Sequence, residues 1–477
     1  MNLNFKSLVR FDRLLLLTLL ALPSAVFLAG LNRAPVPPVD ASIRAIEARH
    51  VVRSGQWFPL IYEGKEVYDH PPLYVWLEAT CMKIFGINDF AVNFPGRLCA
   101  VITVILTWLL AIQAGLSKGA ALFAVIILCA TRDFVLNSVR GYLEPLFEMF
   151  IYGGLWFLLR GFEKNKKILF FVSGICVWLA AFTKGPPAMW PLLFFSCLFF
   201  IFKNKTKNLF LYFSGFLFCT IFWIFWNEAN QFWSHWKDYW NLQVLGSALH
   251  GRGGAQNFEP FYFIKILLKF YWPWLPFFIW SIYLIFLKKN SALNVKVFAT
   301  LGLGFIVGFS LVKWKFWYYI APAYPAFALC IAYALDNKFK YFFTKYETFL
   351  YKGGFCTSIL WAFIAGVFPI PLHKDRVPEV MAFKSTIRDS SIHSPVWFIH
   401  NPMDHNLIAI NGEWYFDRPV YKIVDEASWL KKDLKAPAWI MVGKDFFQTC
   451  ETSWCKKSML IQTAGKSALL YFKGAAL

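Results

Sequence analysis

The sequence has little charge. Of its 477 residues, 16% are Asp, Glu, Lys or Arg, whereas 58% are hydrophobic and 20% are aromatic. A soluble protein needs polar side chains to cover its surface, and this composition supplies too few of them. The shortage of charge therefore excludes an ordinary soluble protein and indicates a membrane protein.

Long apolar runs fill most of the chain before residue 372. Most are long enough to cross a hydrocarbon core of about 30 Å as helices. Because helices satisfy their own backbone hydrogen bonds in lipid, the sequence predicts a polytopic α-helical membrane protein with about 11 or more transmembrane helices. The runs lie at residues 14–30, 98–114, 120–129, 143–159, 168–182, 190–202, 209–226, 270–287, 297–312, 317–335 and 355–370.

The sequence also lacks the marks of a cleaved signal peptide. Lys6, Arg10 and Arg13 precede the first run, but this run is longer than the roughly 7–15 apolar residues of a signal core. No small-x-small cleavage site follows it. We therefore expect the first run to remain as a helix.

Acidic residues are too few to balance the basic ones: 28 Asp and Glu against 48 Lys and Arg give a formal net charge of +20. The excess does not indicate a nucleic-acid partner, because the basic residues cluster in short gaps between apolar runs. With the amino terminus inside, every cluster falls on the cytoplasmic side. We therefore expect a multi-pass protein of the bacterial inner membrane whose working face lies in the periplasm. The clusters lie at residues 160–167, 203–207, 288–296 and 338–352.

The end of the apolar runs divides the chain into two predicted domains. Residues 1–372 are expected to form a transmembrane domain with large periplasmic loops at about 32–95 and 227–262. Residues 373–477 turn polar and are expected to form a small soluble periplasmic α/β domain. No internal repeat is visible in either part.

Short elements are predicted outside the spans. In the first loop, residues 42–54 and 72–85 are expected to be amphipathic segments that lie at the membrane interface. In the soluble part, the patterns predict a strand at 395–400, a helix at 425–434, a strand at 437–443 and a hairpin at 458–474.

Cysteine is nearly absent outside the apolar runs. Seven of the ten cysteines lie in a run and Cys81 lies in the amphipathic segment 72–85, and in these surroundings a thiol behaves as a small hydrophobic group. The exceptions, Cys450 and Cys455, lie in the predicted periplasmic tail, where oxidation is permitted. The sequence allows a disulfide between them, with two free thiols as the alternative.

Cations are rare on the predicted outer face. Lys184 lies at the end of a run in the stretch FTKGPP, and Lys313 and Lys315 lie between the ninth and tenth runs. Each could snorkel to lipid head groups. Several basic residues on one face indicate instead a cradle for an anion, for which a lipid phosphate is the natural candidate. The other members of this set are Arg44, Arg49 and Arg252.

Acids also lie on this face, where they are costly and therefore candidates for function. Asp40 lies at the start of the first loop, Asp69 adjoins His70 in the stretch YDHPP, and Glu144 begins the fourth helical run. Two structural alternatives remain open. Glu144 could pair with Arg140 one turn earlier, and DHPP could be only a turn.

No nucleotide-sugar site is evident, so the chemistry follows from the anion cradle and the acids. A phosphate held by cations is a good leaving group for a sugar on a polyprenyl carrier. A nearby carboxylate can take the proton from an attacking hydroxyl. A single displacement of this kind inverts the anomeric centre and needs no covalent sugar-enzyme intermediate.

Five stretches resemble a known family. The segment from VDASIRAIEARH to YDHPPLYVWL resembles the opening loop of the GT-C integral-membrane glycosyltransferases, in particular the group of protein O-mannosyltransferases and aminoarabinose-to-lipid-A (ArnT-like) transferases. Four further stretches match that group in order, and together they cover nearly the whole membrane part. These are RGYLEPL, FTKGPP, SALHGRGG with the Pro-Trp helix start after it, and KFWYYIAPAYPAFAL.

The resemblance implies a role for several residues. Asp40 matches the general base and Glu144 the second acid, while Lys184 and Lys315 match basic positions on the donor side. It also implies a divalent metal, Zn, Mg or Mn, at Asp69 and His250. The expected donor-phosphate set is completed by His70, Arg44 and Arg252.

The sequence departs from the group at three of these positions: Ala41 replaces a Glu, His70 a Lys and Glu144 an Asp. His70 is a weaker phosphate partner than Lys, because an imidazole is mostly uncharged at neutral pH. These three departures affect the expected identity of the sugar and of the acceptor more than the expected type of reaction.

The sequence therefore predicts an inverting glycosyltransferase that moves a sugar from a polyprenyl (undecaprenyl) phosphate carrier to an envelope acceptor, lipid A or a related lipid. The alternative acceptor is a periplasmic protein Ser or Thr. The alternative of another class is a membrane transporter or lipid flippase. Transporters usually place acids in mid-span and repeat their halves, which this sequence does not do.

Overall fold

The chain forms two compact units in the computed structural model. The first is built from Met1–Ala34, Val67–Leu77 and Asn93–Ile370, and the second from Pro35–Glu66, Glu78–Val92 and Pro371–Leu477. The structure describes residues 13–31, 36, 40–202, 206–250, 259–287, 293–313, 315–367, 378–390, 394–399, 412–422, 437–449, 453–464 and 467–473.

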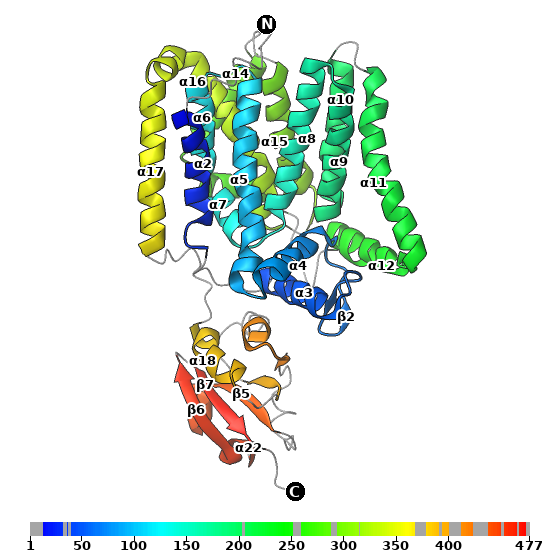
Figure 1. Cartoon of the computed structure of the whole chain (residues 1–477), viewed down its shortest axis with the longest axis vertical. Helices are drawn as coiled ribbons and strands as arrows, with labels where there is room; N and C mark the ends of the chain where they lie inside the picture. The colour runs from blue at the N-terminus through cyan, green and yellow to red at the C-terminus, as the bar shows by residue number, and fades with distance from the viewer. Residues whose placement is uncertain are drawn as a thin grey trace. The chain divides into compact units, whose positions relative to one another are not determined.

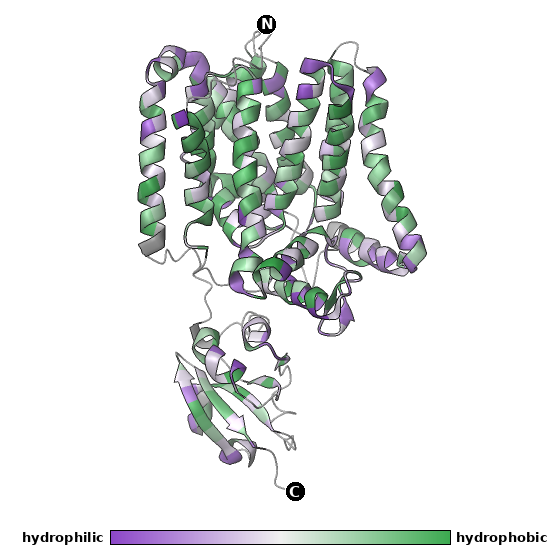
Figure 2. Cartoon of the chain, viewed as in Figure 1, coloured by the Kyte–Doolittle hydropathy of each residue, from purple (hydrophilic) through white to green (hydrophobic). Residues whose placement is uncertain are grey.

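The first unit is helical, and all eleven apolar runs of the sequence coincide with its helices (Figure 1). The middle of these helices is hydrophobic and their ends are more polar, as Figure 2 shows. The helices are α2 (Arg13–Leu28), α5 (Asp89–Gln113), α6 (Lys118–Cys129), α7 (Arg132–Val139), α8 (Glu144–Lys164), α9 (Lys167–Lys184), α10 (Met189–Ile201), α11 (Leu209–Asn230), α12 (Trp233–Asp238), α13 (Tyr262–Phe270), α14 (Leu275–Leu287), α15 (Leu293–Ser310), α16 (Tyr324–Lys345) and α17 (Glu347–Val367).

Among the described residues, five helices are long and apolar enough to cross a membrane, and two bent helix pairs raise that number to seven. The predicted helical membrane architecture is thus confirmed, while the count of eleven crossings stays a prediction. The five are Asp89–Gln113, Lys167–Lys184, Thr206–Asn230, Leu293–Ser310 and Trp317–Lys345.

The two bends have local causes. Helices α13 and α14 meet at 118° around Pro273, which has no backbone N–H and disfavours helix in the residue before it. Helices α6 and α7 meet at 64°, where Thr131 takes an extended conformation before α7 begins. The α13–α14 bend lies inside the apolar run 270–287, and the α6–α7 bend follows the run 120–129 directly.

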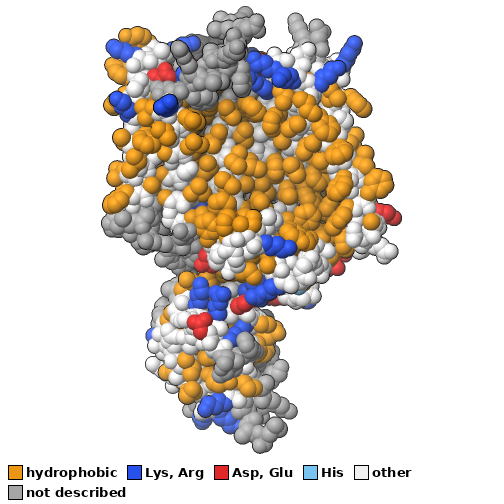
Figure 3. Space-filling model, in the orientation of Figure 1, with side chains coloured by type: hydrophobic (Ala, Val, Ile, Leu, Met, Phe, Trp, Pro, Cys, Tyr) orange, Lys and Arg blue, Asp and Glu red, His pale blue; other side chains and the backbone are white. Residues whose placement is uncertain are grey.

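The helices differ in how much they face lipid. The span that contains α16 is 83% buried, whereas only 11% of the span that contains α11 is buried. Exposed Phe and Ile side chains along α11 suit a lipid-facing position. Hydrophobic side chains cover the helical unit in Figure 3, with Lys and Arg gathered along one edge of the covering.

Helices α9 and α11 approach closely through a pair of glycines. A Cβ added at Gly174 would lie 2.0 Å from the carbonyl oxygen of Tyr212, and one added at Gly215 would lie 2.0 Å from that of Phe171. No L side chain fits at such distances. Small residues at this contact let the two backbones pack directly, as at other membrane helix interfaces.

The second unit contains helix α3 (Asp40–Ser54), a two-stranded hairpin, helix α18 (Pro378–Arg388) and a five-stranded sheet. In the sheet, β3 pairs in parallel with β4 and β5, and the antiparallel pairs β5–β7 and β7–β6 complete the order β4-β3-β5-β7-β6. The strands are β1 (Ile61–Tyr62), β2 (Lys65–Glu66), β3 (Val396–Ile399), β4 (Val420–Lys422), β5 (Ala438–Gly443), β6 (Ser458–Ala464) and β7 (Ser467–Phe472).

The elements expected in the soluble part lie largely where the patterns place them. The strands at 395–400 and 437–443 and the hairpin at 458–474 are present as β3, β5 and the β6–β7 pair. The helix expected at 425–434 lies outside the described residues. Cys455 is disulfide-bonded, the eight cysteines before it in the helical unit and in α4 are free, and Cys450 lies outside the described residues.

Helix α3 departs from the amphipathic segment expected at 42–54. It buries Arg44, Glu47 and Arg49, each of which is less than a tenth exposed. A buried charge must be paired or hydrogen-bonded to be tolerated. The helix is therefore an interior element of the second unit and not a surface segment with one polar face.

Replacing Gly174 by Leu should separate α9 from α11. The overpacked side chain is expected to cost about 1–3 kcal/mol and to lower the melting temperature of the protein in detergent. Gly308→Leu is the matched control, because no atom lies within 4 Å of a Cβ built at Gly308. Equal melting temperatures for the two variants would contradict the direct backbone contact.

Candidate active site

The stretch YDHPPLYVW forms a turn that leads into helix α4 (Leu73–Phe85). Its ends are held by aromatic contacts: the Tyr68 and His235 rings lie 4.7 Å apart, and the Trp76 ring lies 5.5 Å from that of Phe182 and 6.1 Å from that of Trp223. The turn is thereby fixed against the ends of α9 and α11 and against α12. Between the anchors, Asp69 is exposed and His70 is half-buried.

An ion pair joins the start of α8 to the end of α9. The Lys184 ammonium donates to Oε1 of Glu144, and both side chains are nearly excluded from solvent, at 11% and 3% exposed. The helix ends favour these charges, because a carboxylate is stabilised at a helix amino terminus and a cation at a carboxy terminus. This pair answers the sequence alternative for Glu144, since its carboxylate holds Lys184.

The end of α9 is set by Gly185, which has a φ of +76° and follows Lys184 directly. A Cβ at Gly185 would lie 2.1 Å from the Tyr239 hydroxyl oxygen, so a larger residue fits neither the backbone conformation nor the space. Pro186 then begins a separate short helix. The break leaves Lys184 at the very end of the helix, opposite Glu144.

A second acid, Glu148, lies one turn further along α8. Its side chain is fully buried, and its carboxylate oxygens have no hydrogen-bond partner among the described residues. It interacts electrostatically with Glu144 and with Lys184. The sequence analysis did not select Glu148, although its spacing of four residues from Glu144 places both acids on one helix face.

Aromatic rings enclose the ammonium. Lys184 Nζ lies 4.7 Å from the centre of the Tyr319 ring and 5.6 Å from that of Phe309. Ring faces attract cations and exclude water. The Lys184 ammonium is therefore held in a dry setting by two carboxylates and two rings.

The segment that carries Lys315 is fixed beside α7 and α8. Tyr318 stacks on Tyr142 with ring centres 4.3 Å apart, and the Arg140 guanidinium lies 5.8 Å from the Trp317 ring centre. Lys315 itself is 4% exposed. A lysine this enclosed does not fit the interpretation that it only snorkels to lipid head groups.

Two predicted site residues, Asp40 and Arg44, belong to the second unit. Asp40 begins α3, and Arg44 follows one turn later. The buried Glu78 lies within electrostatic range of Arg44 and Glu47; burial raises its pKa well above the usual value, Arg44 opposes the shift and Glu47 adds to it. Arg49 is committed to Asp417, at 2.8 Å.

The metal site expected at Asp69 and His250 stays a prediction. Within the described part of the chain, no group of three or more His, Cys, Asp or Glu side chains is arranged to hold an ion. Asp69 is exposed, while the His250 side chain and Arg252 lie outside the described residues.

Replacing Lys184 by Met should destabilise the protein by about 3–5 kcal/mol, because the buried Glu144 carboxylate loses its cation. The double variant Lys184→Met with Glu144→Leu should recover part of this loss in thermal unfolding in detergent. The control is Arg160→Met, which breaks the more exposed Arg160–Glu163 pair at the other end of α8 and should cost less than about 1 kcal/mol. Equal losses for the two single variants would contradict a buried pair.

Sequence comparison finds relatives over most of the membrane part. The profile of the family described as dolichyl-phosphate-mannose-protein mannosyltransferase matches residues 69–226. An uncharacterized protein of Aquifex aeolicus is 29% identical over 313 residues, which cover 65% of this chain and 61% of the relative. The undecaprenyl phosphate-alpha-4-amino-4-deoxy-L-arabinose arabinosyl transferase of Photorhabdus laumondii is 23% identical over 322 residues, which cover 64% and 56%. The chain thus matches about three fifths of the length of these relatives.

A solved structure shares the fold over nearly the full length. ArnT from Cupriavidus metallidurans, crystallised with undecaprenyl phosphate, superimposes with a TM-score of 0.73 at 15% identity, covering 97% of this chain and 98% of that one. The likeness extends beyond the region that the family profile matches. Residues 69–226 thus resemble the family described as dolichyl-phosphate-mannose-protein mannosyltransferase, and the chain shares the fold of ArnT.

Proposed function

We propose that the protein is an inverting glycosyltransferase that moves a sugar from undecaprenyl phosphate to an acceptor in the cell envelope. The observation that carries the proposal is the enclosed Lys184–Glu144 pair at the junction of α8 and α9. Charges are costly inside a membrane protein and usually mark its function. The names of the relatives support a lipid-phosphate donor.

The proposed donor phosphate is bound by cations. Lys184 and Lys315 occupy enclosed positions in the first unit, and His70, Arg44 and Arg252 complete the proposed set. As the bond between the anomeric carbon and the phosphate oxygen breaks, its electron pair stays with the phosphate. Fixed cations in a dry site stabilise this developing charge more than water does.

The acceptor hydroxyl attacks the anomeric carbon from the opposite side. Asp40, in this proposal, takes the hydroxyl proton as the new glycosidic bond forms, so that charge and atoms balance. Glu144 accepts a hydrogen bond from Lys184 and fixes its position. A single displacement inverts the anomeric centre.

We favour lipid A or a related lipid as the acceptor, because several relatives are named as aminoarabinose transferases that act from undecaprenyl phosphate. A periplasmic protein Ser or Thr is the second candidate, and the description of the matching family supports it. The proposed topology has eleven crossings, an internal amino terminus and a periplasmic carboxy-terminal domain. It places the reaction on the outer face of the inner membrane.

Replacing Asp40 by Asn should reduce sugar transfer by about 10²–10⁴-fold, because the acceptor hydroxyl loses its base. The assay is transfer by the purified full chain from a defined undecaprenyl-phosphate sugar. The control is Glu66→Gln, which neutralises an exposed acid on β2. An unchanged rate in a folded Asp40→Asn protein would remove Asp40 as the base.

Replacing Lys315 by Ala should weaken donor binding more than acceptor binding, because the phosphate loses an enclosed cation. The measurement is the affinity for undecaprenyl phosphate in detergent. Lys313→Ala is a matched control, since Lys313 lies two residues away and is exposed. If both variants change the affinity for undecaprenyl phosphate equally, Lys315 has a structural role and does not bind the donor.

Mass spectrometry of envelope lipids and proteins from cells with and without the gene should identify the acceptor. A mass shift on lipid A supports the favoured acceptor, and a shift on a periplasmic protein supports the second. The size of the shift names the sugar. No shift in either class would favour the transporter alternative.

A further inference from the structure

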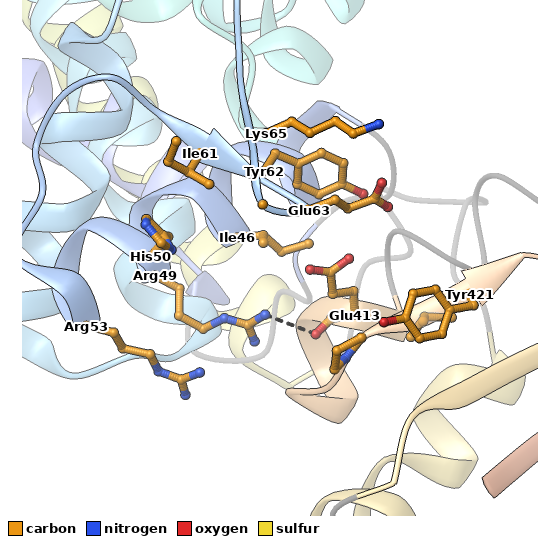
Figure 4. A pocket seen from close by; sticks show the side chains of 13 residues that line it. Ile46, Arg49, His50, Arg53, Ile61, Tyr62, Glu63, Lys65, Glu413 and Tyr421 are labelled. Atoms are coloured by element: carbon orange, nitrogen blue, oxygen red, sulfur yellow. Dashed lines mark hydrogen bonds between the residues drawn. The ribbon is translucent and has the colours of Figure 1, made fainter. Parts of the chain in front are cut away.

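The second unit contains a pocket of about 850 Å³ between α3, the β1–β2 hairpin and residues 413–421 (Figure 4). Its volume lies in the range of sites that hold a small molecule. The pocket includes none of the acids or lysines proposed for sugar transfer. Figure 4 shows basic side chains along α3 on one side and two glutamates on the other.

The basic side of the pocket carries excess positive charge. Arg49 and Arg53 share one carboxylate, that of Asp417: Arg49 lies 2.8 Å from it, and Arg53 donates to both of its oxygens at 2.8 and 2.5 Å. Arg388 adds a further positive charge within electrostatic range of Asp417. One carboxylate therefore faces more than one guanidinium, and His50 lines the same side.

The acidic side comes from two different parts of the unit. Glu63 lies at the tip of the β1–β2 hairpin, where Glu63 and Gly64 both have positive φ, +50° and +73°. This two-residue turn suits the twist of a hairpin, although Asn, Asp or Gly is the usual first residue. Glu413 lies opposite, and its backbone carbonyl accepts a hydrogen bond of 3.2 Å from Arg49.

The two glutamates act on each other. The pKa of Glu413 is raised to about 7, chiefly by burial and then by the nearby Glu63 carboxylate, while Arg49 opposes the shift. Lys65 also lines the pocket; like Glu63 it is exposed, so solvent screens both charges, whereas Glu413 is half-buried. The acidic side is therefore an incompletely neutralised pair that a bound cation would stabilise.

We propose that this pocket binds a zwitterionic head group that carries an ammonium and a phosphate, of the phosphoethanolamine type. The ammonium lies between Glu63 and Glu413, and the phosphate lies toward Arg53 and His50. The Tyr62 and Tyr421 rings, which also line the pocket, supply apolar faces for the linker between the two charges. A ligand with both charges satisfies both sides, whereas an anion or a cation alone satisfies one.

The test uses the purified full chain in phosphatidylglycerol nanodiscs and isothermal titration calorimetry with O-phosphoethanolamine. The expected affinity exceeds those for ethanolamine and for glycerol phosphate by at least about tenfold, because each of these carries one of the two charges. The ratio of the wild-type affinity to that of Glu413→Gln should also rise from pH 6 to pH 8, as Glu413 ionises opposite Glu63 and Arg49; this ratio isolates Glu413 from His50, whose charge also depends on pH in this range. A second nanodisc that contains phosphatidylethanolamine identifies the source of the natural ligand. If O-phosphoethanolamine no longer binds there, the lipid head group occupies the pocket. If it still binds, the natural ligand is soluble.

Variants separate the two sides. Glu413→Gln should lower the phosphoethanolamine affinity at least about tenfold at pH 8 and less at pH 6, while Arg53→Gln should lower the affinity for glycerol phosphate as well. Glu66→Gln, on the same hairpin but outside the lining, should change nothing. Equal affinities for the three probes, or an unchanged affinity in folded Glu413→Gln, would overturn the proposal. Since the readout is binding, these results do not depend on whether the protein transfers sugar.

Discussion

One ion pair sets the arrangement of the helical unit. Glu144 and Lys184 are buried in an apolar bundle, and each is tolerated only because the other neutralises it. The pair needs a helix that begins at Glu144 and another that ends at Lys184, which Gly185 provides. The surrounding rings of Phe309 and Tyr319 then exclude the water that would weaken it. The position of the Lys184 ammonium is therefore set jointly by the ends of two helices, by Gly185 and by aromatic packing.

The sequence predicts the helices well because lipid leaves few alternatives. Every apolar run coincides with helix, and the turn at YDHPP begins a helix as its prolines suggest. The sequence also predicts that Lys184 and Glu144 are candidate site residues, since each charge lies at the end of an apolar run. It does not predict that they bind each other, because 40 residues separate them and only packing of α8 on α9 joins them.

Other features could not be predicted because they depend on tertiary contacts. Glu148 was missed since an acid inside a helix resembles an ordinary helical residue until burial is known. Helix α3 was expected to present a polar face, but several of its charged side chains are buried. One of them, Arg49, pairs with Asp417, which lies 368 residues later in the sequence (417 − 49). The roles assigned to Asp40, His70, Arg252 and His250 rest on resemblance and remain proposals.

The glycine contact between α9 and α11 has a mechanical consequence. Lys184 ends α9, while Trp223, toward the carboxy-terminal end of α11, packs against Phe182, so the two helices are joined at the glycines and again near the ammonium. Backbones in direct contact cannot slide or tilt independently. The position of the cation is thus controlled by residues remote from it. Natural or engineered changes along this seam offer a way to adjust turnover while every chemical group stays the same.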